Sequence, residues 1–383
     1  MDSLTQAALG ATVGHAILGT KVGSKIGRLA PVWGAALGTL PDLDVLIPYG
    51  GVVEDFTYHR GFSHSLLVQA LVTPLLVWLA IKIHPQTHEH KLRWGAAILA
   101  IFWTHSLLDA FTVYGTQLLW PITEYPFGIS SLFIIDLTYT LPLLIGLGIA
   151  AYVEWNSRKA RIASVCALVI SSSYLAWSLV AKSTMKSILQ ETLVQQNMNV
   201  YAVLTTPMPF NTLLWRVVAI NDQDYYVAHV AVWDSPESVD FRAYPKGEEL
   251  LSDIADQWNV QRLQWFTKGF YRAELVNNEV VITDLRMGLE DSYVFNFAVG
   301  KQVKKSADSD STDRSENTER SENRESSDNG NVSIEPMVAR RTETLRDMSR
   351  LPLLWDRFFD NEVSLHPEPI ISARSAPEVS ESE

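Results

Sequence analysis

The hydrophobic and polar positions divide the chain into two parts. Up to about residue 181, long runs of Leu, Ile, Val, Ala and Trp alternate with short polar loops, and the remainder has the mixed pattern of a water-exposed protein. About 20 residues of apolar helix cross a bilayer, and four runs approach or exceed that length, at 65–83, 94–112, 131–153 and 161–181. Two weaker segments, 4–20 and 29–48, are rich in Gly and Ala, which favours tight helix packing over lipid contact. The pattern predicts an α-helical polytopic membrane domain, residues 1–181, with four to six membrane helices.

The spacing of hydrophobic residues changes in the second part of the chain. After a polar helical stretch at about 182–200, the runs LLWRVVAI, DYYVAHVAVW and VVITDLRM are typical of strands separated by turn formers. They predict a smaller β-rich (α+β) soluble domain over 182–300. Residues 301–335 contain a polar, low-complexity stretch that we expect to be a disordered linker. Residues 336–383 are expected to hold a short helix at 342–359 and a disordered acidic tail.

The loops between the apolar segments carry a charge bias. Arg60 is the only basic residue of the loops at 49–64 and 113–130. The alternate loops hold nine basic residues: Lys21, Lys25, Arg28, Lys82, Lys91, Arg93, Arg158, Lys159 and Arg161. By the positive-inside rule these loops are cytoplasmic. The chain is therefore predicted to be a multi-pass protein of the bacterial inner (cytoplasmic) membrane, with a periplasmic soluble domain.

Overall charge and cysteine content exclude some classes of function. The net charge is −12, carried mostly by the second part of the chain, which argues against nucleic acid as a partner. The single cysteine, Cys166, can form neither an internal disulfide nor a Cys-based zinc motif.

Ionisable residues in membrane segments are costly, and here they gather at one depth. The segment LPDLD, the segment HRGFSHS (59–65) and the HSLLD pair at i, i+4 all fall at the predicted periplasmic ends of their helices. A further aspartate, Asp136, lies near the start of the apolar segment at 131–153. The candidate metal ligands are Asp42, Asp44, His59, His64, His105, Asp109 and Asp136.

Imidazole and carboxylate without thiolate suit a divalent metal, with zinc preferred and manganese or iron as alternatives. Seven candidates exceed the needs of one ion, so one or two ions are expected, activating water for hydrolysis. Asp109 is assigned to both metal binding and catalysis, and Arg60 to binding an anion such as a phosphate. Glu54 and Asp55 are candidate general acids.

Two other interpretations of these residues stay open. The aspartates of LPDLD could form a turn and a helix cap, and the histidine and aspartate of HSLLD could join helices by a hydrogen bond. In that case the protein is a non-enzymatic membrane scaffold or regulator. A transporter is disfavoured because its polar groups would string through the bilayer instead of gathering at one face.

Five ordered blocks carry a resemblance to a known family: MDSLTQAALGA, GTLPDLD, HRGFSHS, HSLLDAFTVYGTQLLWP and IIDLTYTLP. Together they resemble the YdjM-like, LexA-regulated family of bacterial inner-membrane metal-dependent hydrolases over about residues 1–150. The stretch WFTKGFYRAELVNNEVVITDLRMGLEDSYVFNF is similar to the C-terminal extension of longer members.

The resemblance implies a polytopic inner-membrane protein with metal-dependent hydrolase activity. The matched motifs place the ligands on Asp42, Asp44, His59, His64, His105 and Asp109, and Asp136 falls in a matching block. The family's opening block often has histidine where this chain has Gln6, so Gln6 is not counted as a ligand. The helical His/Asp pattern is also similar by analogy to zinc-dependent phospholipase C and nuclease enzymes, which suggests a phosphoester substrate, a membrane lipid or lipid-linked phosphate.

Overall fold

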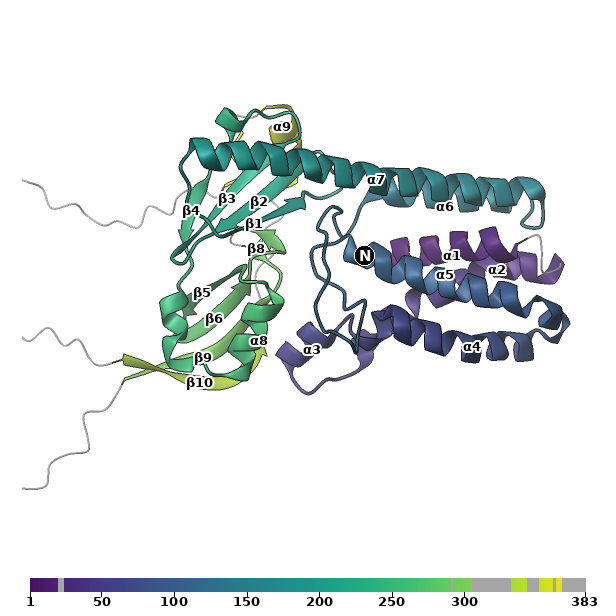
Figure 1. The fold of residues 1–383 in the computed structure, drawn as a ribbon, viewed down its shortest axis with the longest axis horizontal. Coiled ribbons are helices and arrows are strands. Elements are labelled where there is room, and N and C mark those ends of the chain that lie inside the picture. Colours follow the sequence, from purple (N-terminus) through teal and green to yellow (C-terminus); the bar gives the residue numbers. More distant parts are fainter. Residues whose placement is uncertain (20–23, 291, 305–331, 343–350, 361–362, 367–383) are drawn as a thin grey trace, which may run out of the picture.

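The helical part and the β-rich part of the chain lie end to end, and one long helix runs along both (Figure 1). The computed structural model describes residues 1–19, 24–290, 292–304, 332–342, 351–360 and 363–366. The order predicted from the sequence, a helical region followed by a β-rich domain, is confirmed. The bundle consists of α1 (Ser3–Leu18), α2 (Ser24–Thr39), α4 (Leu66–Ile83), α5 (Lys91–Ala110), α6 (Leu137–Tyr152) and α7 (Arg158–Gln195).

Two helices of the described chain, α4 and α7, are long and apolar enough to cross a membrane, and α6 is a shorter apolar helix. Helix length therefore supports fewer spans than the predicted four to six. The predicted helix at 131–153 begins only at Leu137, because the Asp136 side chain accepts hydrogen bonds from the first backbone amides of α6. The segment at 29–48 is also divided, since α2 ends at Thr39 and a 3₁₀ helix, η1 (Pro41–Leu46), follows.

Glycines let α1 and α2 approach closely, as the Gly- and Ala-rich pattern predicted. Gly10 and Gly14 of α1 face Gly34 and Gly38 of α2, and a Cβ atom on any of the four would collide with backbone of the other helix. Such small-residue packing is a common way to join helices in membranes. It also fixes the height of the Gly38 carbonyl, which matters for the site described below.

We expect Gly34→Val to destabilise the bundle, because the new side chain would overlap the Gly10 carbonyl oxygen. Overpacking of this kind costs about 1–3 kcal/mol, measurable as a lower thermal midpoint in detergent. Gly148→Ala in α6 is the matched control, since its Cβ would meet nothing within 4 Å. Equal midpoints for Gly34→Val and wild type would show that the two helices do not pack in this way.

Two four-stranded antiparallel sheets make up most of the β-rich domain. The first has the order β1-β2-β3-β4 and the second β10-β9-β6-β5, with a small β7-β8 ribbon beside them. The helix α8 (Trp258–Phe266) packs against the second sheet. A further helix, α9, spans Leu351–Phe359. The strands are β1 (Ala202–Pro207), β2 (Leu214–Ile220), β3 (Asp224–Ala231), β4 (Arg242–Pro245), β5 (Tyr271–Val276), β6 (Glu279–Asp284), β7 (Gly288–Leu289), β8 (Ser292–Tyr293), β9 (Asn296–Lys304) and β10 (Val332–Arg341).

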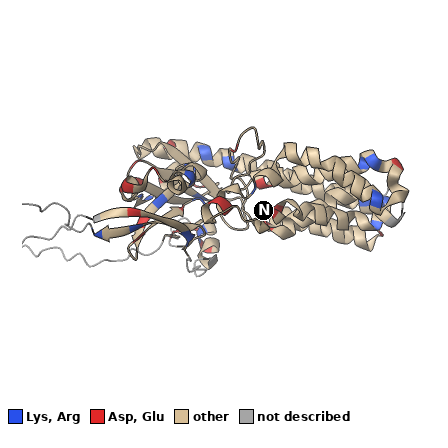
Figure 2. Cartoon of the chain, turned by 90° about the horizontal axis from the view of Figure 1, so that it is seen from below, with Lys and Arg blue, Asp and Glu red and all other residues tan. Residues whose placement is uncertain are grey.

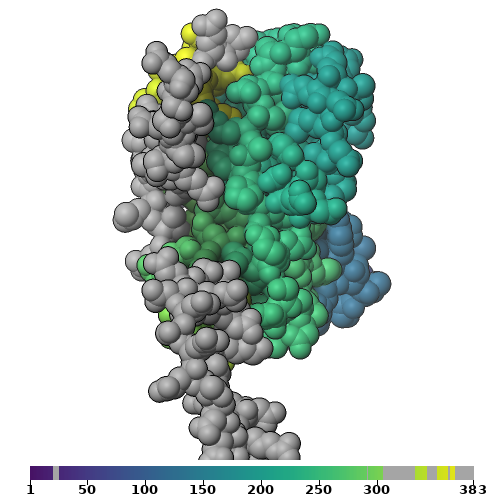
Figure 3. Space-filling model, turned by 90° about the vertical axis from the view of Figure 1, so that its left-hand side faces the viewer, coloured from purple at the N-terminus to yellow at the C-terminus, as the bar shows by residue number. Residues whose placement is uncertain are grey.

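The second half of α7 covers the first sheet. Its residues Ala181, Met185 and Leu189 share a buried apolar cluster with Trp215 and other inward residues of β2 and β3. Because α7 has 38 residues, it is about 57 Å long, enough to leave the bundle and continue along this sheet. Figure 3 looks onto the end of the molecule that the domain forms, where teal and green atoms make up most of the coloured surface.

The β-rich domain extends past residue 300, where we expected it to end. The strand β9 runs to Lys304, and β10 returns at Val332 to pair with it in the antiparallel sense. The low-complexity residues 305–331 and the acidic tail after residue 366 lie outside the described residues. Of the helix expected at 342–359, the structure describes α9 at Leu351–Phe359.

A histidine is buried in the first sheet without a hydrogen bond to either ring nitrogen in the part of the chain that is described. Burial lowers the pKa of His229 to about 3, and the positive charges of Arg216 and Arg357 act in the same direction, although Glu290 opposes them. The folded domain therefore holds this ring neutral at pH values where an unfolded chain would protonate it.

We expect acid to destabilise the β-rich domain through His229. Its pKa is about 3 when folded and about 6.5 when unfolded. The full free energy of unfolding is therefore present above pH 6.5, and it falls between pH 6.5 and pH 3, by on the order of 3 kcal/mol at pH 4. His229→Gln should flatten this fall in thermal midpoint, followed by circular dichroism. His88→Gln, an exposed histidine, should keep the wild-type profile, and an unchanged profile in His229→Gln would contradict the prediction.

Candidate metal centre

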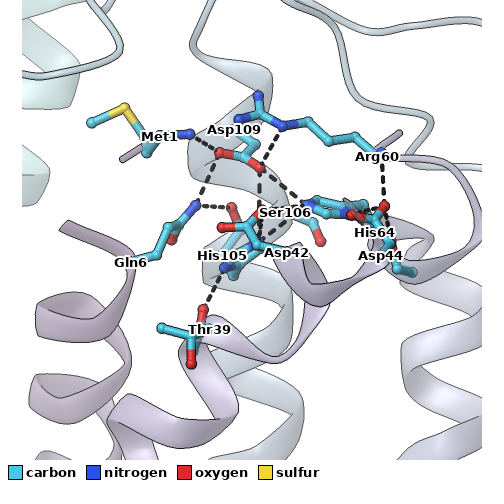
Figure 4. Close-up of polar contacts among 12 residues, drawn as sticks. Met1, Gln6, Thr39, Asp42, Asp44, Arg60, His64, His105, Ser106 and Asp109 are labelled. Carbon is cyan, nitrogen blue, oxygen red and sulfur yellow. Dashed lines mark hydrogen bonds and ion pairs between the residues drawn. The ribbon is translucent and has the colours of Figure 1, made fainter. Parts of the chain in front are cut away.

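Three segments meet at the end of the bundle that faces the β-rich domain. The 3₁₀ helix η1 carries Asp42, a second short 3₁₀ helix, η2 (Phe62–His64), ends on His64, and α5 carries His105 and Asp109 one turn apart. Each of these four residues offers one ligand atom, and the four atoms all lie within 4.8 Å of one another (Figure 4). The sequence therefore predicted correctly that LPDLD, HRGFSHS and HSLLD converge.

Five of the six distances among the four atoms are close to those of a tetrahedral site. His64 Nε2 lies 3.1 Å from His105 Nε2, 3.3 Å from Asp42 Oδ1 and 3.2 Å from Asp109 Oδ2. His105 Nε2 lies 3.5 Å from Asp42 Oδ1 and 3.7 Å from Asp109 Oδ2. In a zinc site with metal–ligand bonds of about 2.0–2.1 Å, neighbouring ligand atoms are about 3.3–3.4 Å apart. A divalent ion would need little rearrangement of these side chains.

The hydrogen bonds of both histidines leave Nε2 free to bind a metal. His105 Nδ1 donates to the Gly38 carbonyl oxygen at 2.7 Å, so its Nε2 carries the lone pair in the neutral ring. Ser63 Oγ donates to Asp44 Oδ2 at 2.7 Å and therefore accepts from His64 Nδ1 at 2.8 Å. Such outer hydrogen bonds fix the tautomer and orientation of metal-binding histidines.

Asp109 is the most deeply buried carboxylate of the group. Its Oδ1 accepts hydrogen bonds from the amino group of Met1 and from Gln6 Nε2, the latter at 2.9 Å. Its Oδ2 is buried and, among the described residues, accepts no hydrogen bond, although His64 Nε2 and Arg60 Nε both lie 3.2 Å away. A buried carboxylate oxygen without a donor is what a bound cation would satisfy.

The local charges also favour a cation. Burial opposes protonation of His64, but the neighbouring carboxylates of Asp109 and Asp42 raise its pKa above the ordinary value. The same two carboxylates would attract a divalent ion to this place.

The remaining sequence candidates lie beside the group or away from it. Asp44 is not among the four; it accepts from the Arg60 amide at 2.9 Å and from Ser63, and its Oδ1 lies 2.8 Å from His59 Nδ1. His59 therefore points its Nδ1 at Asp44. Asp136 is separate, because its carboxylate caps α6 and accepts from the Tyr174 hydroxyl at 2.9 Å.

The two candidate general acids do not join the group either. Glu54 and Asp55 lie in the first turn of the helix α3 (Val52–Tyr58), and Asp55 accepts a hydrogen bond from the Tyr49 amide.

Aromatic residues attach the segment that carries the site to the β-rich domain. Phe56 of α3 packs against Phe266 of α8 and Phe297 of β9, with ring centroids 4.9 and 5.1 Å apart. Tyr114 packs in the same cluster, donates to the Phe56 carbonyl, and lies 5.1 Å from the Arg60 guanidinium carbon. The helix α3 thus leads from the core of the β-rich domain directly to the HRGFSHS segment.

The sequence prediction missed the role of Gln6 and Ser63. Gln6 was set aside because the resembling family often has histidine there, yet its amide supports Asp109. Ser63 orients His64, whereas the next serine, Ser65, caps α4. The available signal for Gln6 was its position in the block MDSLTQAALGA, where the resembling family often has histidine.

The helical part of the chain matches the model of a known family. The model of the YdjM inner membrane protein family matches residues 1–185. The helical region of the chain belongs to the YdjM inner membrane protein family. All four residues of the group lie within the matched part, and the match ends inside α7, before the β-rich domain. No curated protein and no solved structure matches the chain.

We expect Gln6→Leu to weaken zinc binding, because Asp109 Oδ1 would lose one of its donors. Loss of such a support typically lowers metal affinity about 10–100-fold, which competition with a chromophoric chelator would measure. Thr12→Val on the same helix is the matched control, since the Thr12 hydroxyl donates to the Ala8 carbonyl of its own helix. Equal affinities for Gln6→Leu and Thr12→Val would contradict a supporting role for Gln6.

Proposed function

We propose that this protein is a multi-pass inner-membrane hydrolase that uses a divalent metal ion, preferably zinc, to cleave a phosphoester of a membrane lipid or lipid-linked phosphate. The observation that carries the proposal is the tetrahedral spacing of Asp42, His64, His105 and Asp109, together with the buried Asp109 Oδ2. Two imidazoles and two carboxylates suit zinc, and manganese or iron could bind the same donors. We propose one ion, because only one such group occurs among the described residues.

Residues around the group have distinct roles in this proposal. A bound ion would supply the Lewis acidity that activates water and polarises a phosphoryl oxygen. The Arg60 guanidinium, next to Asp109, would stabilise negative charge on the phosphoryl group. The His59 side chain is partly exposed and its Nδ1 is held by Asp44, which leaves Nε2 to carry a proton to or from the substrate.

The orientation proposed for the protein places the site at the periplasmic face. Figure 2 shows Lys and Arg residues at the end of the bundle away from the β-rich domain, and α5 and α7 begin at this end, with Lys91 and Arg158 as their first residues. By the positive-inside rule that end is cytoplasmic. The β-rich domain lies at the opposite end, together with Asp42, His64, His105 and Asp109, which we call the metal group. Both would then face the periplasm.

The first test is metal content. Purified wild type should bind about one zinc per chain, measured by elemental analysis, and the His64→Ala, Asp109→Ala double variant should bind none, because half of the ligand atoms are gone. His88→Ala removes an exposed histidine elsewhere and should keep the metal.

The second measurement is hydrolysis of p-nitrophenyl phosphate and bis-p-nitrophenyl phosphate. Wild type should hydrolyse at least one ester and lose that activity after chelation, while the double variant should be inactive with or without zinc. Zinc binding without hydrolysis would instead support the non-enzymatic alternative, a scaffold with a closed structural site. Equal trace metal in wild type and double variant would overturn the metal site itself.

A further inference from the structure

The 3₁₀ helix that carries Asp42 has an apolar outer surface. Its two acidic side chains are the inward ones: Asp44 is 3% exposed, and the Asp42 side chain is 19% exposed. The outward side chains have exposed fractions between 42% and 75%, and they are Leu40, Leu43, Val45, Leu46 and Ile47. Loops that face water are normally polar, whereas an exposed apolar patch marks contact with a partner or a membrane.

This surface continues onto a candidate membrane span. Phe62 of η2 is exposed between η1 and α4, and both of these elements contact η2. The helix α4 then exposes Leu67, Leu71 and Trp78 along its length. The outer surface of η1 is therefore continuous with a face that suits lipid, and not an isolated patch.

The accessible edge of the metal group lies within this surface. The side chains of His64, His105 and Asp109 are at most 1% exposed, so Asp42 is the ligand through which solvent or substrate reaches the group. Its chain neighbours on either side include the exposed Leu40 and Leu43.

We propose that residues 40–47 are immersed in the bilayer and that the metal group is reached from the lipid phase. The substrate is then a phospholipid whose acyl chains stay in the bilayer against Leu43 and Leu46, while its phosphate passes Asp42 toward Arg60 and the ion that the four residues would hold. This substrate assignment rests on the proposed hydrolase function, whereas the immersion of residues 40–47 does not.

Fluorescence tests the immersion. In a Cys166→Ser background, Leu46→Cys is labelled with an environment-sensitive dye and the protein is reconstituted into phosphatidylcholine vesicles. We expect a blue-shifted emission that nitroxide-labelled lipids quench and aqueous iodide does not. Ser252→Cys, at an exposed position of the β-rich domain, should show the reverse. Iodide quenching at position 46 equal to that at position 252 would overturn the proposal.

Hydrolysis tests the substrate class. The zinc-loaded protein is given phosphatidic acid in vesicles with p-nitrophenyl phosphate as its soluble monoester counterpart, and phosphatidylglycerol with bis-p-nitrophenyl phosphate as the diester pair. We expect Leu46→Ser to lower hydrolysis of the lipid at least tenfold and to leave the soluble ester unchanged, because position 46 touches only the acyl chains.

The outcomes separate the two proposals. Hydrolysis of soluble esters without any lipid hydrolysis, or an equal loss of both in Leu46→Ser, would overturn the lipid substrate and leave the hydrolase standing. No hydrolysis of any ester would overturn the hydrolase and with it the lipid substrate, while the fluorescence result would still decide the immersion of residues 40–47.

Discussion

The buried carboxylate of Asp109 is the constraint around which the end of the bundle is arranged. A charged carboxylate without partners costs several kcal/mol when it is removed from water, and this one lies at the end of a helix in an apolar bundle. Its compensating groups come from separate parts of the chain, Gln6 on α1, Arg60 and His64 in the HRGFSHS segment. Each of these segments must therefore meet α5 at the same height. The polar group and the helix packing depend on each other.

The close approach of α1 and α2 serves the same end. Since glycines allow backbone contact between these helices, Gly38 can present its carbonyl to His105 while Gln6 reaches Asp109. A wider separation would move one of the two contacts out of range. Tight packing thus positions the Gly38 carbonyl and the Gln6 side chain, in addition to stabilising the bundle.

The β-rich domain belongs to the construction of the site although it lies outside the family match. Phe56 and Tyr114 are part of its apolar core; Phe56 lies three residues before His59, and Tyr114 contacts both His59 and Arg60. Arg286, held by Asp284, donates to the Tyr114 carbonyl from the same domain. Packed rings thus connect this domain to the residues beside the candidate metal site.

The sequence by itself determined the division into a helical and a β-rich part, the close packing of α1 and α2, and the convergence of three polar segments, because hydrophobic period, glycine content and loop charge are local properties. It could not separate Asp42 from Asp44, two residues apart in one segment. Only the turn of η1 directs the first carboxylate to the histidines and the second to Ser63 and His59. The sequence also grouped Asp136 with the candidate ligands, because the depth of a residue in the membrane can be predicted from sequence. The side to which its side chain points depends on helix packing, and Asp136 points to Tyr174.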